Sequence, residues 1–274
     1  MFGFQEQEVD KGIFSWFGYV FPMAERFTMI RAAGFTSVML WWGGEFDQSP
    51  GEYLTHPSLA RTYGLTVENA HLPYIMANEL WTGGSFEKLL LDGLQNCSKY
   101  DVPVLVAHVS EGVSPPEPTQ RGLDTLLRAA ELCERLNIRL ALENVRQSRH
   151  LDYALAHVDS KMVGFCYDIG HSRVVYGREH VLLKRYADRL MALHLHDNDG
   201  TGDQHLLPFD GDVDWESFAL ILSRTAYGGT LALEVDPQDW QNPDRRPAEV
   251  YLADAYQRAC RLEALCLSHS RTIF

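Results

Sequence analysis

Histidine and carboxylate side chains stand at the ends of several short apolar runs in this sequence. Ala141-Leu142-Glu143, Ala192-Leu193-His194 and Ala232-Leu233-Glu234 repeat one scheme, in which a small residue stands two positions before a polar one, with leucine between them. Residues two apart in a strand face the same way, so the leucines would face outward while the polar groups point inward at the strand ends. The full set of such groups, with two from the loop after the seventh run, is His71, His108, Glu143, Asp168, His171, His194, Asp203, His205 and Glu234.

These side chains are of the kinds that ligate divalent metal ions. Imidazole nitrogens and carboxylate oxygens bind Zn²⁺, Mn²⁺, Fe²⁺ and Mg²⁺, and converging carboxylates would repel each other strongly without a cation between them. Any one of them has a simpler interpretation, as a helix-cap partner, an ion-pair member or a hydrogen-bonded histidine. Together they predict a divalent-metal cofactor, with zinc or manganese expected and one to three ions bound. His196 has the same parity as His194 but falls in the turn, so we expect it behind the ligands or at the surface.

Such a site requires strands that end side by side. Short apolar runs predict eight strands, at Gly12–Phe17, Ser37–Trp41, Thr66–Ala70, Val104–His108, Arg139–Glu143, Val163–Asp168, Leu190–His194 and Thr230–Glu234. Amphipathic segments between them predict helices, including Met23–Ala33, Phe86–Tyr100, Gly122–Leu136, His180–Ala187, Trp215–Arg224 and Pro247–Leu265. This alternation predicts an α/β fold, a single (β/α)₈ TIM barrel of parallel strands over residues 1–274, with its active site at the C-terminal strand ends. An open doubly wound sheet is the alternative, but no GxGxxG follows the first strand.

Composition limits the partners and the compartment. The formal net charge of −13 argues against a basic surface for nucleic acid or membranes, although bound divalent ions would offset part of it locally. The five cysteines form no CxxC pair, which indicates small buried residues in a reducing compartment. The first eight residues contain neither the basic nor the apolar stretch of an export signal, and no apolar run is long enough to cross a bilayer. We therefore expect a cytoplasmic protein with no membrane partner, while homo-oligomer formation stays open.

Six segments, taken in order, carry a resemblance to a known superfamily. They are Ala70-His71-Leu72-Pro73-Tyr74, Leu142-Glu143-Asn144, Tyr167-Asp168-Ile169-Gly170-His171, Leu193-His194-Leu195-His196-Asp197, Asp203-Gln204-His205 and Glu234. The ordered set resembles the xylose-isomerase-like TIM-barrel superfamily, which joins sugar isomerases and epimerases, inosose dehydratase and endonuclease IV. The resemblance covers most of the chain, from the third predicted strand to the eighth.

Two branches of that superfamily imply different metal sets. Ketose 3-epimerases bind one metal, through positions that match Glu143, Asp168, His194 and Glu234, with a histidine matching His171 beside it. Endonuclease IV binds three zinc ions and adds ligands that match His71, His108, Asp203 and His205. On that second pattern one ion would lie between His71, His108 and Glu143, a second between Glu143, Asp168, His194 and Glu234, and a third between His171, Asp203 and His205.

Aromatic and basic residues near the predicted strand ends are candidates for substrate binding. The aromatic residues could form a stacked wall for a sugar ring, or they could pack between barrel and helices; they are Trp16, Phe17, Trp41, Trp42 and Trp81. Tyr74 matches a tyrosine of endonuclease IV that enters DNA. Arg146 and Arg173, with Arg149, follow the fifth and sixth strands closely and could hold a phosphate or carboxylate.

The resemblance and the two glutamates predict a metal-dependent isomerase or epimerase of a small sugar, sugar phosphate or polyol derivative. Metal would polarise the carbonyl of a hydroxy-carbonyl substrate. Glu143 and Glu234, from well-separated strands, would remove and return a proton through a metal-stabilised enediolate, while His171 orients substrate or water. One departure weakens a direct ketose-epimerase assignment, because Asp199-Gly200 stand where those enzymes place an arginine after His194.

Two other functions are alternatives. The complete nine-residue set also fits an endonuclease IV-like multinuclear zinc phosphodiesterase acting on abasic DNA or another phosphoester. The loop Trp42–Asp47 is acidic and aromatic, however, whereas DNA binding needs Lys and Arg contacts to phosphate, so nucleic acid is not the expected partner. The other alternative is a sugar-binding protein without turnover, and the presence of both Glu143 and Glu234 argues against it.

Overall fold

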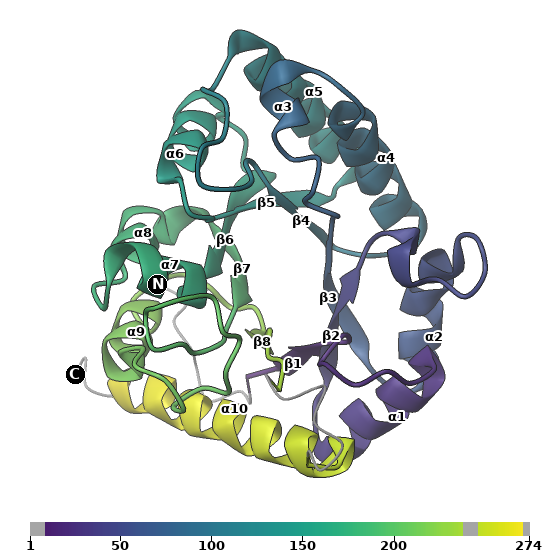
Figure 1. Cartoon of the computed structure of the whole chain (residues 1–274), viewed down its shortest axis with the longest axis vertical. Helices are drawn as coiled ribbons and strands as arrows, with labels where there is room; N and C mark the ends of the chain where they lie inside the picture. The colour runs from purple at the N-terminus through teal and green to yellow at the C-terminus, as the bar shows by residue number, and fades with distance from the viewer. Residues whose placement is uncertain (1–8, 238–245, 271–274) are drawn as a thin grey trace.

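The strands form one parallel sheet that curls into a barrel. The computed structural model describes residues 9–237 and 246–270, with the strands at the centre and the helices around them (Figure 1). The strands are β1 (Lys11–Phe14), β2 (Ser37–Trp41), β3 (Thr66–His71), β4 (Val104–His108), β5 (Arg139–Glu143), β6 (Val163–Asp168), β7 (Leu190–His194) and β8 (Leu231–Leu233). Each pairs in parallel with its neighbours in the order β7-β6-β5-β4-β3-β2-β1-β8, which confirms the predicted (β/α)₈ fold.

Backbone hydrogen bonds close the barrel between the two outer strands of this order. The Leu195 amide, just past β7, donates to the Ala232 carbonyl of β8 at 2.9 Å, and the Glu234 amide donates back to the Leu195 carbonyl at 3.0 Å. Closure leaves no open sheet edge and directs the C-terminal ends of all the strands to one rim. The polar residues that end or follow the strands therefore meet in one place.

Helices lie outside the strands and connect them (Figure 1). Within the described residues they are α1 (Met23–Ala33), α2 (His56–Thr62), α3 (Glu79–Thr82), α4 (Phe86–Lys99), α5 (Gln120–Leu136), α6 (Ser148–His157), α7 (Ile169–Tyr176), α8 (Val181–Arg185), α9 (Trp215–Leu222) and α10 (Ala248–Ser270). Short 3₁₀ segments are η1 (Gly44–Phe46), η2 (Glu52–Thr55) and η3 (Ala187–Arg189). None of these described helices is apolar over the length needed to reach across a bilayer.

Strand side chains alternate between two cores. Small residues fill the narrow barrel interior, where the buried cluster is Val104, Val106, Ala141, Cys166 and Ala192. Leu142, Leu193 and Leu233 instead pack in the larger core that includes the outer helices, and burying each leucine contributes about 1.5–3 kcal/mol. The alanine of the repeated scheme therefore fits the interior, the leucine fixes the strand to the helices, and the polar residue reaches the rim.

Several predicted element boundaries differ from the observed ones. β1 ends at Phe14 rather than Phe17 because the chain then turns, with Gly18 at a φ of +80° that favours glycine. β8 ends at Leu233, so Glu234 lies one residue past the strand. The predicted helix His180–Ala187 divides into α8 and η3. Residues 1–8, on which the expectation about an export signal depends, lie outside the described residues.

A buried aspartate organises the long loop between β7 and α9. Asp197 is fully buried, and its Oδ1 accepts hydrogen bonds from the amides of Asn198 and Val213 at 2.9 and 3.0 Å. Its Oδ2 accepts from the Phe209 amide at 2.9 Å and from Trp215 Nε1 at 2.8 Å. One carboxylate thus ties both ends of this loop together, and the loop carries two of the candidate metal ligands.

Replacing Asp197 by asparagine tests this role. In Asp197→Asn an amide nitrogen, which only donates, would replace one carboxylate oxygen and would face N–H groups that now donate to that oxygen. We expect the free energy of unfolding to fall by about 3 kcal/mol because these hydrogen bonds are lost. Denaturant unfolding measures the change. Asp199→Asn, on the exposed part of the same loop, is the matched control, and equal losses in the two variants would contradict the role of Asp197.

Candidate metal centre

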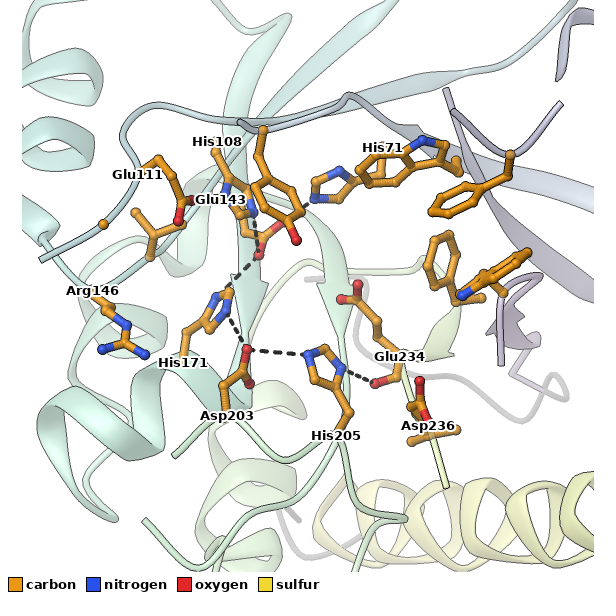
Figure 2. A pocket seen from close by; sticks show the side chains of 18 residues that line it. His71, His108, Glu111, Glu143, Arg146, His171, Asp203, His205, Glu234 and Asp236 are labelled. Carbon is orange, nitrogen blue, oxygen red and sulfur yellow. Dashed lines mark hydrogen bonds and ion pairs between the residues drawn. The ribbon is translucent and has the colours of Figure 1, made fainter. Parts of the chain in front are cut away.

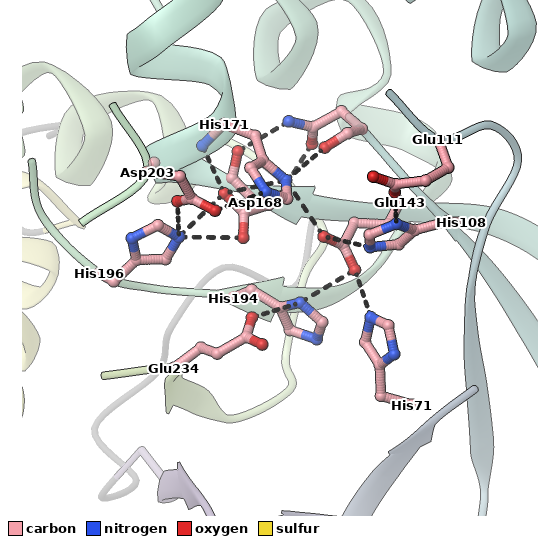
Figure 3. A network of polar contacts seen from close by, with 12 residues as sticks. His71, His108, Glu111, Glu143, Asp168, His171, His194, His196, Asp203 and Glu234 are labelled. Atoms are coloured by element: carbon pink, nitrogen blue, oxygen red, sulfur yellow. Dashed lines mark hydrogen bonds and ion pairs between the residues drawn. The ribbon is translucent and has the colours of Figure 1, made fainter. Parts of the chain in front are cut away.

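Four imidazoles surround one carboxylate at the rim of the barrel. Glu143 ends β5 and is 1% exposed. Its Oε2 lies 3.0 Å from His71 Nε2 and 3.1 Å from His194 Nδ1, and its Oε1 lies 3.3 Å from the nearest ring nitrogens of both His108 and His171 (Figure 3). Burial by itself would raise the pKa of Glu143, but His108, His194 and His171 outweigh it and hold the pKa well below its ordinary value.

Backbone carbonyls fix the tautomers of three histidines near this carboxylate. His71 Nδ1 lies 2.7 Å from the Leu72 carbonyl, His171 Nδ1 lies 2.9 Å from that of Asn144, and His205 Nδ1 lies 2.8 Å from that of Glu234. Since a carbonyl only accepts, each Nδ1 must carry the proton, and in a neutral ring Nε2 then holds a lone pair. This is the state in which histidine ligates a metal.

Those Nε2 atoms face carboxylate oxygens. The partners are Glu143 for His71, at 3.0 Å, and Asp203 Oδ2 for both His171 and His205, at 3.2 and 3.3 Å (Figure 2). Two acceptors at this distance are unfavourable unless a proton or a cation lies between them. The arrangement therefore fits a shared metal ion, and without one the imidazoles must be protonated.

His194 gives a second indication of the same kind. Its Nδ1 lies 2.9 Å from Glu234 Oε2 and 3.1 Å from Glu143 Oε2, yet neither ring nitrogen has a hydrogen-bond partner of acceptable geometry, although the ring is buried. Buried polar atoms are almost always satisfied. A ring nitrogen and two carboxylates that converge without hydrogen-bond geometry are what a common cation would require.

Hydrogen bonds with three neighbouring residues fix the position of Asp168. Its Oδ1 accepts from the His171 amide at 2.6 Å and so caps α7, and its backbone exchanges two hydrogen bonds with the Asn144 side chain, at 2.8 and 2.9 Å. His196 Nε2 lies 3.1 Å from both carboxylate oxygens and is 0% exposed. A Cβ on Gly170 would stand 1.9 Å from the His196 ring, so only glycine allows this approach.

The candidate ligands form four groups in the described residues, each with ligand atoms within 4.8 Å of one another. These are His71, Glu143 and His194; Asp168, His194 and Glu234; Glu143, Asp168 and His171; and His196, Asp203 and His205. His108 belongs to none of them, but its ring lies between two carboxylates. Its Nε2 is 3.3 Å from Glu143 Oε1 and its Nδ1 is 3.6 Å from Glu111 Oε2. His196 and Glu111 are the site residues that the sequence did not single out as candidates, and both belong to loops that follow strands.

A cavity of about 440 Å³ opens above these groups. Glu143, Glu234, His71, His108, His171, Asp203 and His205 line it, with Trp16, Trp41, Tyr74 and Arg146. The Trp41 ring stacks on His71 at a centroid separation of 5.7 Å, and the Tyr74 ring stacks on His108 at 4.8 Å. Aromatic faces therefore border the candidate metal ligands on one side of the cavity.

Two proposed substrate contacts lie elsewhere. Trp81 is buried on α3, donates its Nε1 hydrogen to the Val109 carbonyl and packs over Gly122, so it is a core residue rather than part of the cavity wall. Arg173 binds Asp212 Oδ2 at 2.8 Å and is outside the cavity lining. Phe17 and Trp42 are also buried in the core, as their packing interpretation required.

Comparison with known proteins shows the family of this chain. A family model described as xylose isomerase-like TIM barrel matches residues 27–255, so the chain belongs to that family. The uncharacterized protein y4fM of Sinorhizobium fredii is 36% identical over 129 residues, which are 45% of this chain and 40% of the relative. The uncharacterized protein MJ1311 of Methanocaldococcus jannaschii is 25% identical over 185 residues, or 60% of this chain and 62% of the relative. The chain thus spans less than two thirds of the length of these curated relatives.

A solved L-ribulose 3-epimerase is similar in structure. Its TM-score is 0.75 at 14% sequence identity, and the likeness covers 97% of both chains. At this identity the comparison shows a shared fold.

Protons and metal should compete for the same nitrogens. In the metal-free protein burial opposes protonation, but Glu143 and Glu111 raise the pKa of His108 to about 9, and Asp203 and Glu234 raise that of His205 to about 10. Because the two pKa values are higher in the folded protein, protonation of these rings contributes to the free energy of unfolding. This contribution is fully present below the unfolded pKa of about 6.5 and is lost as the pH rises through the folded pKa values. A metal ion needs both rings neutral.

We therefore expect Zn²⁺ to raise Tm more at about pH 8.5 than at about pH 6, since protonated rings resist the ion at the lower pH. Thermal unfolding with and without the ion, in non-chelating buffers, measures the difference. An equal rise in Tm at the two pH values would contradict this competition.

His196 should position Asp168 for metal binding. His196→Asn removes the ring nitrogen that contacts both oxygens, and we expect metal affinity to fall about 10- to 100-fold. Titration against a competing chelator measures the affinity. His157→Asn, at the exposed end of α6, is the control, and unchanged affinity in His196→Asn would show that Asp168 needs no such support.

Proposed function

We propose that this protein is a metal-dependent isomerase or epimerase of a small sugar, sugar phosphate or polyol derivative. The observation that carries the proposal is that Glu143 and Glu234 contact the same His194 nitrogen and both line the 440 Å³ cavity. Two carboxylates that reach one cavity from opposite parts of the barrel can act on two faces of a bound substrate. The likeness in fold to L-ribulose 3-epimerase supports the same class of reaction.

The chain's own residues would bind the ion and move the proton. Glu143, Asp168, His194 and Glu234 would hold one Zn²⁺ or Mn²⁺, and further ions would lie nearer His71 or Asp203. When bound, a divalent ion polarises the substrate carbonyl and so acidifies the neighbouring carbon. Burial would raise the pKa of Glu234, but His194 and His205 lower it, so its carboxylate is ionised and can accept a proton.

Proton transfer would then use the two glutamates in turn. One carboxylate removes the proton from the carbon beside the carbonyl, which leaves an enediolate. The other carboxyl, in its protonated form, returns a proton to the opposite face in an epimerase, or to the adjacent carbon in an isomerase. His171, which lines the same cavity and is held by Asn144 and Asp203, would orient the substrate hydroxyls.

Arg146 is the arginine best placed for an anionic substrate group. It lines the cavity near Glu111 and His171 (Figure 2) and forms no ion pair within the described residues. Arg149 and Arg173, in contrast, are bound to Glu117 and Asp212. A phosphate or carboxylate on the substrate would therefore meet Arg146.

The test is proton exchange at carbon. We expect the protein, loaded with Mn²⁺ or Zn²⁺, to exchange a substrate C–H for deuterium from solvent across a panel of ketoses, aldoses and their phosphates. Glu143→Gln and Glu234→Gln should each lower the rate by about 10²- to 10⁴-fold, while Glu249→Gln, on the exposed start of α10, should not. Mass spectrometry or NMR measures the exchange, and full activity in both cavity variants would rule out the acid–base roles.

A multinuclear phosphodiesterase is the second candidate. The Asp203 cluster favours it, because His171, Asp203 and His205 lie beyond the four ligands that one ion needs. Several ions can activate water and stabilise the leaving oxygen. Cleavage of a duplex that contains one abasic site, abolished in Asp203→Asn, would establish this activity, whereas the proposed isomerase leaves that duplex intact.

A further inference from the structure

A second, smaller cavity adjoins the first at the same rim. It has a volume of about 50 Å³ and lies between the loops that follow β1 and β2 and the first turns of α1 and α2. Trp16, Trp41 and Phe46 line both cavities. The two cavities therefore share an aromatic wall.

A buried arginine without an acidic partner lines the smaller cavity. Arg26 on α1 is 4% exposed and donates to the carbonyls of Phe21 at 2.8 Å and Ser15 at 3.4 Å. Its guanidinium carbon lies 4.1 Å from the centroid of the Trp16 ring. No Asp or Glu of the described residues forms an ion pair with it, although a buried cation is costly without a counter-charge or full hydrogen bonding.

Two polar atoms of residues that line this cavity have no hydrogen-bond partner. His56 is 8% exposed and its Nε2 is unsatisfied. Asp47 Oδ1 accepts from the Tyr53 amide at 3.0 Å, but the buried Oδ2 accepts no hydrogen bond. The cavity thus brings together a guanidinium that is bound to backbone carbonyls, with an imidazole nitrogen and a carboxylate oxygen that have no partner. Native interiors rarely leave such atoms unsatisfied.

The cavity lining contains both a cation and carboxylates, and this combination favours a neutral ligand that bears hydroxyl groups. A phosphate or carboxylate would suit Arg26 but would be repelled by Asp47 and Glu52, which line the same cavity. A hydroxyl group both donates and accepts, so neighbouring hydroxyls can accept from Arg26 and donate to Asp47 Oδ2. Since one water needs about 10–15 Å³ of such volume, the space suits two or three hydroxyl-bearing carbons.

We propose that this cavity is a hydroxyl-binding subsite that takes the far, polyol end of an extended substrate. Arg26, Asp47 and His56 bind the terminal hydroxyls, and the reacting carbons lie across Trp16 and Phe46 at Glu143 and Glu234. The assignment to a substrate end rests on the proposed sugar-converting function. The Trp16 and Phe46 rings stack at a centroid separation of 4.4 Å and form the shared wall that the ligand chain crosses.

Xylitol is the probe for this subsite. In a crystal of the full chain soaked in xylitol, we expect hydroxyl density in the cavity in contact with Asp47 and Arg26. By calorimetric titration, Asp47→Asn and His56→Gln should each weaken binding about tenfold, as expected for loss of a hydrogen bond to a charged or buried partner. Glu45→Gln is the matched control on the same loop, because its amide oxygen can still accept from Trp41 Nε1 and it lines neither cavity.

The outcomes separate the subsite from the reaction. Xylitol in the cavity, with binding weakened in Asp47→Asn and unchanged in Glu45→Gln, supports the subsite whether or not the protein exchanges substrate protons. Only ordered water in the cavity at saturating xylitol, or equal affinities in the two variants, overturns the subsite even if exchange is observed. If Asp47→Asn fails to fold, the affinity of His56→Gln, compared with that of Glu45→Gln, decides the question in the same way.

Discussion

The site depends on imidazole nitrogens whose lone pairs are turned toward carboxylates. His71, His171 and His205 each donate a hydrogen bond from Nδ1 to a backbone carbonyl, which leaves Nε2 facing Glu143 or Asp203 at 3.0–3.3 Å. In water such groups would separate, but here closed strands and a short helix hold them together. The fold thus provides a position for a cation, and the backbone carbonyls that fix the tautomers are as much a part of it as the ligands.

The rest of the structure serves to keep this arrangement fixed. Barrel closure between Leu195 and β8 brings Glu234 to the same rim as Glu143. Asp197 fixes the loop that supplies Asp203 and His205 through four hydrogen bonds. The strand interiors below the site contain small residues such as Ala141 and Ala192, so the polar side chains above them can converge without steric conflict.

Much of this could be predicted from the sequence, because strand alternation is a local rule. The alternation of strands with helices predicted the barrel, and the Ala-Leu-polar scheme placed Glu143, His194 and Glu234 at its rim. Contacts between distant loops follow no such rule, so the sequence left two positions open for His196, behind the ligands or at the surface, and the structure buries it against Asp168, behind the ligands. Trp81 follows a strand but lies on a helix that turns it into the core, and no spacing pattern shows that.

The most direct test of the metal centre is elemental analysis of the purified protein, compared with Glu143→Gln. Glu143 contacts four imidazoles and belongs to two of the ligand groups, so its oxygens should be essential to at least one ion. We predict one to three divalent ions per wild-type chain, zinc or manganese, and fewer in the variant. A wild-type protein that holds no ion, and takes up none when Zn²⁺ or Mn²⁺ is added, would contradict the existence of this centre.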